Sequence, residues 1–186
     1  VIDTQTDANG DTTGFTFQFE EWEYLDGPHP VAETINWIAV EEGVHTLPDG
    51  RVIEAGTASA TNGNTGVSFA GNHADPPVVL TNVMSNTDTT TVDSDPFNIS
   101  NTGFTLSLQE EEAQDGIHAA ETVGWIAIQP GTGAVTQGGV DENTDTIGLG
   151  GTFADPVTVV ETQTMNGGDT AVAMLDGGNG SSTVGA

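Results

Sequence analysis

The chain of 186 residues contains a long internal repeat whose copies stand in an unusual order. Residues 14–29 match residues 103–118 at an offset of 89, with eight identities that include a Gly-Phe-Thr start and a final histidine. After a one-residue shift, "ETINWIA" from Glu33 matches "ETVGWIA" from Glu121. Further along, "ADPPVVLTNVM" from Ala74 matches "ADPVTVVETQT" from Ala154 at an offset of 80. Any fold for this chain must therefore be built from repeated modules.

The order of the matches predicts one complete module between two half modules. The predicted parts are a second half at 1–43, a connector hairpin at 44–64, a complete module at 65–131, a linker at 132–143 and a first half at 144–186. A half module leaves an apolar face in water, at a cost of roughly 25 cal/mol per Å², and invites aggregation. The missing half could come from the chain's other end, from a neighbouring chain by strand complementation, or from the next segment of a longer array. We favour completion between neighbouring chains or repeats, which would make a filament.

The local pattern predicts an all-β chain of antiparallel β-sandwich modules in tandem. Two-residue alternation places the apolar residues of "FTFQF" (15–19) and of "FTLSL" (104–108) on one face of a strand. "VGWIAI" (123–128) is apolar on both faces, which is typical of a central strand. "PPVVLTNVM" (76–84) reads as another strand, and Pro-Asp-Gly at 48–50 predicts the turn of a hairpin over 44–55.

Charge limits the classes of partner. The chain has 28 acidic residues against one basic residue, Arg51, and a formal net charge of −27. This balance excludes nucleic acid as a partner and disfavours anionic membrane surfaces. No apolar run approaches the roughly 18 residues of a membrane span, so no membrane insertion is expected. The composition is typical of a secreted or cell-surface protein of a marine or halophilic microbe, and its remaining partners are copies of itself, calcium ions and neutral glycans.

Two acidic stretches are candidate Ca²⁺ sites, because Ca²⁺ takes six to eight oxygen ligands and Glu-x-Glu places two carboxylates on one strand face. The alternative for both is a solvated acidic loop. The first stretch is the loop after residue 109, with its repeat copy; its candidate ligands are Glu110, Glu112, Asp115, His118 and Glu121, and Glu21, Glu23, Asp26 and Glu33. The second is "DANGD", in which Asp7, Asn9 and Asp11 alternate as calcium-loop ligands do.

Histidine and aromatic side chains raise a second set of alternatives. His118 precedes a repeated glutamate by three residues and either orients a metal ligand or caps the turn before the next strand. Trp37 and Trp125 lie in two-sided apolar strands and are expected in the core. Trp22 and Tyr24 replace Glu111 and Ala113 of the other copy, beside carboxylates, and are predicted to bind a glycan or a neighbouring chain. No catalytic or cofactor motif is present, so an enzyme is not expected.

Three phrases of the complete module, "FAGNHADPPVVL", "NISNTGFTLSL" and "VGWIAI", resemble the H-type lectin domain. The likeness spans residues 67–128 and involves mostly core positions. It implies a six-stranded antiparallel sandwich and, by analogy with snail agglutinins and discoidins, binding of N-acetylgalactosamine or related sugars near subunit contacts. Members of the family typically use an arginine for the sugar, whereas this stretch contains none.

Overall fold

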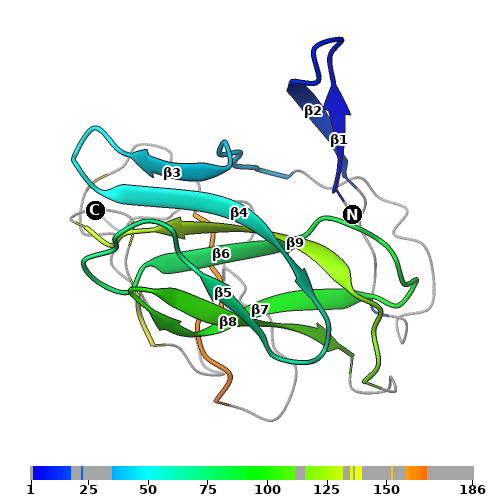
Figure 1. Cartoon of the computed structure of the whole chain (residues 1–186). Coiled ribbons are helices and arrows are strands. Elements are labelled where there is room, and N and C mark those ends of the chain that lie inside the picture. Colours follow the sequence, from blue (N-terminus) through cyan, green and yellow to red (C-terminus); the bar gives the residue numbers. More distant parts are fainter. Residues whose placement is uncertain are drawn as a thin grey trace.

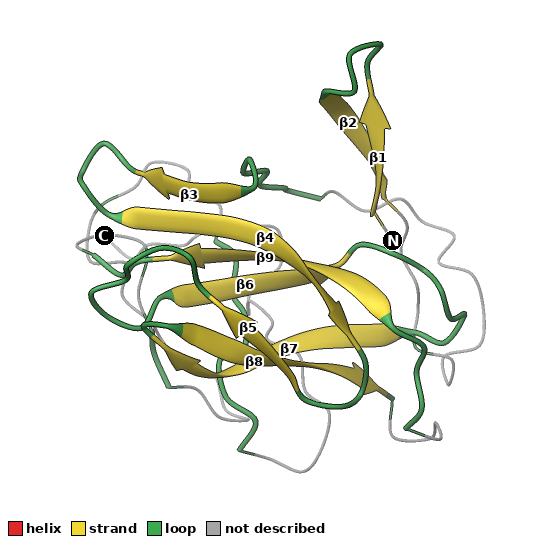
Figure 2. Cartoon of the chain, viewed as in Figure 1, coloured by secondary structure: helices red, strands yellow, loops and turns green. Residues whose placement is uncertain are grey.

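The computed structural model describes residues 2–17, 22, 35–111, 116–131, 135, 137–139, 152 and 158–166. Within these ranges the fold is all-β, as predicted, and contains no helix that could cross a membrane (Figure 2). The strands are β1 Ile2–Thr6, β2 Thr12–Phe17, β3 Gly43–Thr46, β4 Val52–Ala60, β5 Thr65–Ser68, β6 Val78–Val83, β7 Val92–Ser100, β8 Gly103–Glu110 and β9 Glu121–Ile128.

Seven of the described strands form a sandwich of two antiparallel sheets (Figure 1). One sheet has the order β3-β4-β9-β6 and the other the order β5-β8-β7. The first sheet is fixed in register by β9, which pairs Trp125 with Gly56 of β4 and with Thr81 of β6. The predicted sandwich is thus present, but a six-stranded module is not confirmed, because β3 adds a fourth strand to the first sheet.

The core between the sheets follows the alternation read from the sequence. "FTLSL" buries Phe104, Leu106 and Leu108 between the layers, and β9 buries Val123, Trp125 and Ala127 on the same side. The rings of Phe104 and Trp125 meet edge to face, with centroids 5.7 Å apart, an arrangement that adds to their area burial. The predicted central strand is confirmed, since β9 lies between β4 and β6 and is at least half-buried on its second face from Gly124 onward.

The predicted hairpin over 44–55 is confirmed as β3 and β4, joined by the turn at Pro48, Asp49 and Gly50. Its predicted role as a connector outside the module is corrected. β4 pairs with β9 over eight residues, from Ile53 to Ala60, and so stands inside the four-stranded sheet. The physical reason is that β9 is a buried strand whose backbone N–H and C=O groups need hydrogen-bond partners on both edges, and β4 supplies them on one edge. The sandwich therefore begins at Gly43 and not at residue 65.

The first part of the chain holds a separate hairpin, β1–β2, whose second strand includes residues 14–17, the repeat of the first four residues of β8. Among the described residues this hairpin pairs with no other strand and projects from the sandwich (Figure 1). Its Phe17 is 40% exposed, whereas the repeat counterpart Leu106 is fully buried. The prediction that Trp37 lies in a core is wrong: it is 68% exposed, against 7% for Trp125. Residues 35–41 form no strand, and among the described residues the ring contact of Trp37 is with Phe15 of β2, edge to face with centroids 5.6 Å apart.

Gly103 is required where β8 passes β5. Its φ of +157° is a conformation that side-chain-bearing residues rarely adopt, and a Cβ there would collide with the carbonyl oxygen of Val67. Gly66, on the paired strand β5, has open space around its Cβ position.

We expect Gly103→Ala to lower the free energy of unfolding by about 2–4 kcal/mol, since a backbone contact cannot be relieved by moving a side chain. Gly66→Ala should change it by less than about 0.5 kcal/mol. Urea unfolding followed by tryptophan fluorescence measures both values, and equal effects of the two substitutions would contradict the steric account.

Candidate functional site

A buried glutamate organises the loop between β6 and β7. Glu121, the first residue of β9, accepts hydrogen bonds at Oε1 from the backbone nitrogens of Thr87 (2.6 Å) and Asp88 (2.9 Å). Its Oε2 accepts a short hydrogen bond from the hydroxyl of Ser85, which itself accepts one from the backbone nitrogen of Thr122 at 2.6 Å. A buried carboxylate needs such donors, and these four bonds fix the shape of the loop.

His118 lies between two of the predicted acidic residues. Its Nε2 is 3.4 Å from Oε1 of Glu121, and its Nδ1 is 3.4 Å from Oε1 of Glu110. All three side chains are buried, and neither ring nitrogen makes a hydrogen bond of good geometry. The backbone nitrogen of His118 donates to Oδ1 of Asn62 at 2.5 Å. The repeated histidine thus bridges two repeated glutamates at the start of β9.

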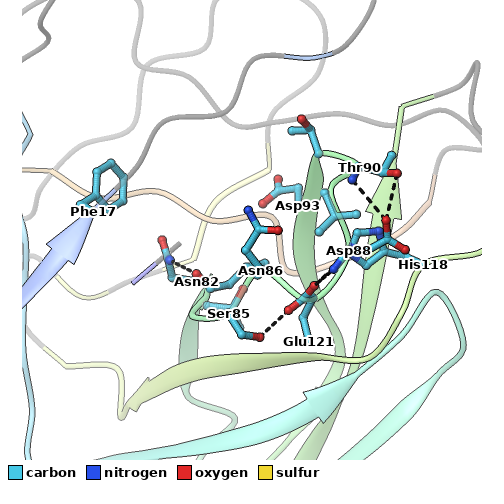
Figure 3. Close-up of a pocket in the computed structure, with 13 residues that line it drawn as sticks. Phe17, Asn82, Ser85, Asn86, Asp88, Thr90, Asp93, His118 and Glu121 are labelled. Atoms are coloured by element: carbon cyan, nitrogen blue, oxygen red, sulfur yellow. Dashed lines mark hydrogen bonds and ion pairs between the residues drawn. The ribbon is translucent and has the colours of Figure 1, made fainter. Parts of the chain in front are cut away.

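Above this network lies a pocket of about 210 Å³. The end of β6, the β6–β7 loop and the beginning of β7 form its walls, and Phe17 of β2 stands at one side (Figure 3). Hydroxyl, amide and carboxyl groups dominate the lining, which consists of Phe17, Thr81, Asn82, Val83, Ser85, Asn86, Asp88, Thr90, Thr91, Val92, Asp93, His118 and Glu121. Such a surface suits a neutral polar ligand that can both donate and accept hydrogen bonds.

Hydrogen bonds set the charge state of the pocket floor. Burial acts to raise the pKa of Glu121, but the bonds from Ser85, Asp88 and Thr87 outweigh it and hold the pKa below its usual value. The backbone nitrogens of Ala119 and Thr90 likewise lower the pKa of Asp88. Both groups are therefore carboxylates at neutral pH, and the floor of the pocket is anionic.

A second buried glutamate–histidine pair, which the sequence did not reveal, repeats this arrangement elsewhere in the sandwich. Glu54 of β4 accepts hydrogen bonds from the backbone nitrogens of Ala70 and Gly71, both at 2.8 Å. The Nε2 of His73 lies 3.4 Å from Oε2 of Glu54, and its ring packs on Phe69 with centroids 4.8 Å apart. The available signal was a lone glutamate in the apolar run "VIEAG" together with a histidine that had no repeat partner.

The "DANGD" stretch forms the β1–β2 turn. The carboxylate of Asp7 accepts hydrogen bonds from the backbone nitrogens of Asn9 (2.8 Å) and Asp11 (3.0 Å), and these bonds lower its pKa. The three side chains are exposed, and the Asp7 oxygens are already used in closing the turn. Their common role in the structure is therefore a side-chain-stabilised turn.

Calcium binding stays a prediction. Among the described residues no group of three or more histidine, aspartate or glutamate side chains is placed to hold a metal ion. Of the predicted ligands, Glu110, His118 and Glu121 come together as a buried network, while Asp7, Asn9 and Asp11 share one turn. The others lie outside the described residues; they are Glu112, Asp115, Glu21, Glu23, Asp26 and Glu33. Trp22 is half-buried, and Tyr24 also lies outside the described residues.

Comparison with known proteins shows a similarity to part of a much longer chain. No protein-family model matches the chain. The chain is similar to halomucin of Haloquadratum walsbyi (strain DSM 16790 / HBSQ001), with 29% identity over 158 aligned residues. The alignment covers 78% of this chain but only 2% of halomucin, so the matched relative is a very long protein of which this chain spans a small part.

We expect Glu121→Gln to lower the free energy of unfolding by about 1–3 kcal/mol at pH 7, because an amide cannot accept all the hydrogen bonds that the loop donates. The matched control is Glu42→Gln at an exposed position, for which we expect a change within about 0.5 kcal/mol. Chemical denaturation of the three proteins provides the comparison.

The difference in unfolding free energy between the wild-type protein and Glu121→Gln should become smaller as the pH falls. The folded state lowers the pKa of Glu121, so its stabilisation is complete above the ordinary value of 4.5 and is lost as the pH falls through the folded-state pKa. The stability difference between the wild-type protein and Glu121→Gln should therefore shrink below about pH 4.5. A difference that grows under acid conditions would contradict this assignment.

Proposed function

We propose that this chain is an extracellular structural repeat protein, a subunit of a filament or matrix, in which the split module is completed between neighbouring chains or repeats. The protein is secreted or held at the cell surface and has no catalytic role. The order of the sequence repeats supports this function. The strongest support is the exposure, in one copy, of residues that form the core in the other.

Equivalent positions of the two repeat copies are buried in one copy and exposed in the other. Leu106 and Trp125 lie in the sandwich core, whereas their repeat counterparts Phe17 and Trp37 are 40% and 68% exposed. Ile38, next to Trp37, is 52% exposed. Full burial of each such side chain is worth about 1.5–3 kcal/mol, so covering this surface with the matching half module would be strongly favourable.

The match to halomucin is compatible with this proposal, because it places a similar stretch within a very long chain. Repeat proteins bury the faces of their units against neighbouring units, and their terminal repeats are atypical. A unit that begins and ends with half modules would join its neighbours through a completed sandwich at every junction.

The net charge of −27 sets the conditions under which assembly should occur. Like charges on neighbouring subunits repel. Added salt shortens the range of this repulsion, to a Debye length of about 3 Å at 1 M. Divalent cations would act similarly, and calcium bound at the predicted acidic loops would stiffen the junctions. We therefore place assembly in a medium of high salt or high calcium.

The test is deletion of residues 1–42, which removes the predicted second half module and keeps β3. We expect the full chain at high salt to sediment as large species and to form filaments under negative-stain electron microscopy. The deletion should yield a monomer, because the complementary surface is gone. Circular dichroism and cooperative unfolding would confirm that the remaining sandwich is folded.

A matched control is deletion of residues 1–10, which removes β1 and most of the first turn but keeps the repeated stretch from Gly14 onward. This shorter deletion should retain assembly. Filaments that persist without residues 1–42, or a full chain that stays monomeric at high salt and with calcium, would contradict the proposal.

The pocket beside Glu121 favours a second candidate function, a lectin-like adhesin that binds neutral glycans. Its lining of hydroxyl, amide and carboxylate groups offers the hydrogen-bond partners that sugar hydroxyls require. The lining carries no lysine or arginine side chain, and Glu121 and Asp88 make it anionic, which argues for a neutral rather than an acidic sugar.

For this candidate we expect Asn86→Ala, at an exposed position of the pocket, to abolish binding on a glycan array measured with calcium present. Asn101→Ala, in the β7–β8 turn and outside the pocket, should leave binding unchanged. An array without signal for the wild-type protein would exclude the adhesin function and leave the structural one untouched.

A further inference from the structure

The outer edge of β6 is covered by side chains of a segment from far along the sequence. Residues 158–166, orange in Figure 1, pass this edge without forming a strand. The side-chain amide of Gln163 accepts a hydrogen bond from the backbone nitrogen of Val79 at 2.9 Å and donates one to its carbonyl oxygen at 2.7 Å. It thus satisfies the same two backbone groups that a neighbouring strand would use.

Glu161 makes a second attachment two residues earlier. Its Oε2 accepts hydrogen bonds from the backbone nitrogen and from the hydroxyl of Thr81, both at 3.4 Å. Val79 and Thr81 alternate with Leu80 along β6, and β9 lies on the other side of the strand. The two backbone nitrogens that face away from the sheet are therefore the ones that Gln163 and Glu161 bind.

The attachment brings three carboxyl groups together. Asp95 of β7 is 4% exposed, and its Oδ1 accepts a hydrogen bond from the hydroxyl of Thr162 at 3.0 Å. Its other oxygen is buried without a hydrogen-bond partner. Asp93 of β7 and Asp95 are the charged groups that act on Glu161, and both disfavour its ionisation. The one basic side chain of the chain, Arg51, bonds instead to Asp49 at 2.7 Å.

We propose that residues 159–163 are a pH-dependent cover of the β6 edge, docked while Glu161 carries a proton and released as that carboxyl group ionises. A protonated Glu161 places no third negative charge beside Asp93 and Asp95, and it has an O–H to donate within the cluster. An ionised Glu161 would be a buried anion next to two others, and the repulsion is relieved when the segment moves into water.

The direction of the pH dependence follows from the docked state. Burial, together with Asp93 and Asp95, raises the pKa of Glu161 to about 8, from the ordinary 4.5 that it regains once released. Docking is therefore fully stabilised below about pH 4.5 and loses that stabilisation progressively up to about pH 8, by as much as tenfold in the docking constant per pH unit. The released edge exposes the unpaired backbone groups of an uncharged strand, "VVLTNV".

Amide hydrogen exchange at single residues tests the proposal directly. The full chain is measured by NMR between about pH 5 and about pH 8, and each rate is corrected for intrinsic exchange. The amides of Val79 and Thr81 should lose protection by at least about a hundredfold across this range. The amide of Leu80, which faces β9, should keep its protection and serves as the internal reference.

Two variants test separately the ionisation of Glu161 and the hydrogen bonds that Gln163 makes to β6. Glu161→Gln keeps a carbonyl acceptor for Thr81 but has no ionisable group, so Val79 and Thr81 should stay protected at both pH values. Gln163→Ala removes both bonds to Val79 and should expose that amide even at about pH 5, while Glu42→Gln should behave as the wild-type protein does. Protection of Val79 that is independent of pH in the wild-type protein would overturn the proposal. So would an unchanged pH dependence in Glu161→Gln, or a parallel loss at Leu80.

Discussion

The fold depends on how buried carboxylates are stabilised in a chain that has almost no cations to pair with them. With 28 acidic residues and a single arginine, ion pairing is not available as a general solution. Glu54 and Glu121 are instead held by backbone N–H groups of neighbouring loops, with a buried histidine beside each. Each carboxylate thereby fixes a loop to a strand of the first sheet. Hydrogen bonds of this kind are little affected by salt, unlike surface ion pairs.

The strands and the core were predictable from the sequence because alternation is local. Phe104, Leu106 and Trp125 follow directly from two-residue periodicity and are buried as expected. Long-range choices were not predictable in the same way. The hairpin of β3 and β4 was recognised, but its membership of the sheet depends on which strand pairs with β9, and local pattern carries no information about that partner.

The candidate site was only partly predictable for a related reason. Repetition pointed to Glu110, His118 and Glu121, and the structure brings these three together. Their partners Ser85 and Thr87 come from a loop without any motif, and they reach Glu121 through the packing of β6 against β9. Trp37 shows the opposite failure. Its sequence context matches that of Trp125, yet its burial depends on neighbouring strands that the described residues do not provide. A repeat predicts what a segment can form, whereas its partners decide what it does form.

Gly14 shows the same difference between a repeated sequence and its surroundings, through the contacts that a Cβ atom would make there. It occupies the repeat position of Gly103, where β5 passes so close that a Cβ cannot be accommodated. At Gly14 itself, the nearest contact of a Cβ would be an ordinary 3.4 Å to the side chain of Gln5. The small residue at position 14 thus matches a steric demand that the hairpin alone does not make. If the split module is completed as we propose, a counterpart of β5 would make this demand on β2, and an alanine at position 14 would then block assembly while leaving the free hairpin unstrained.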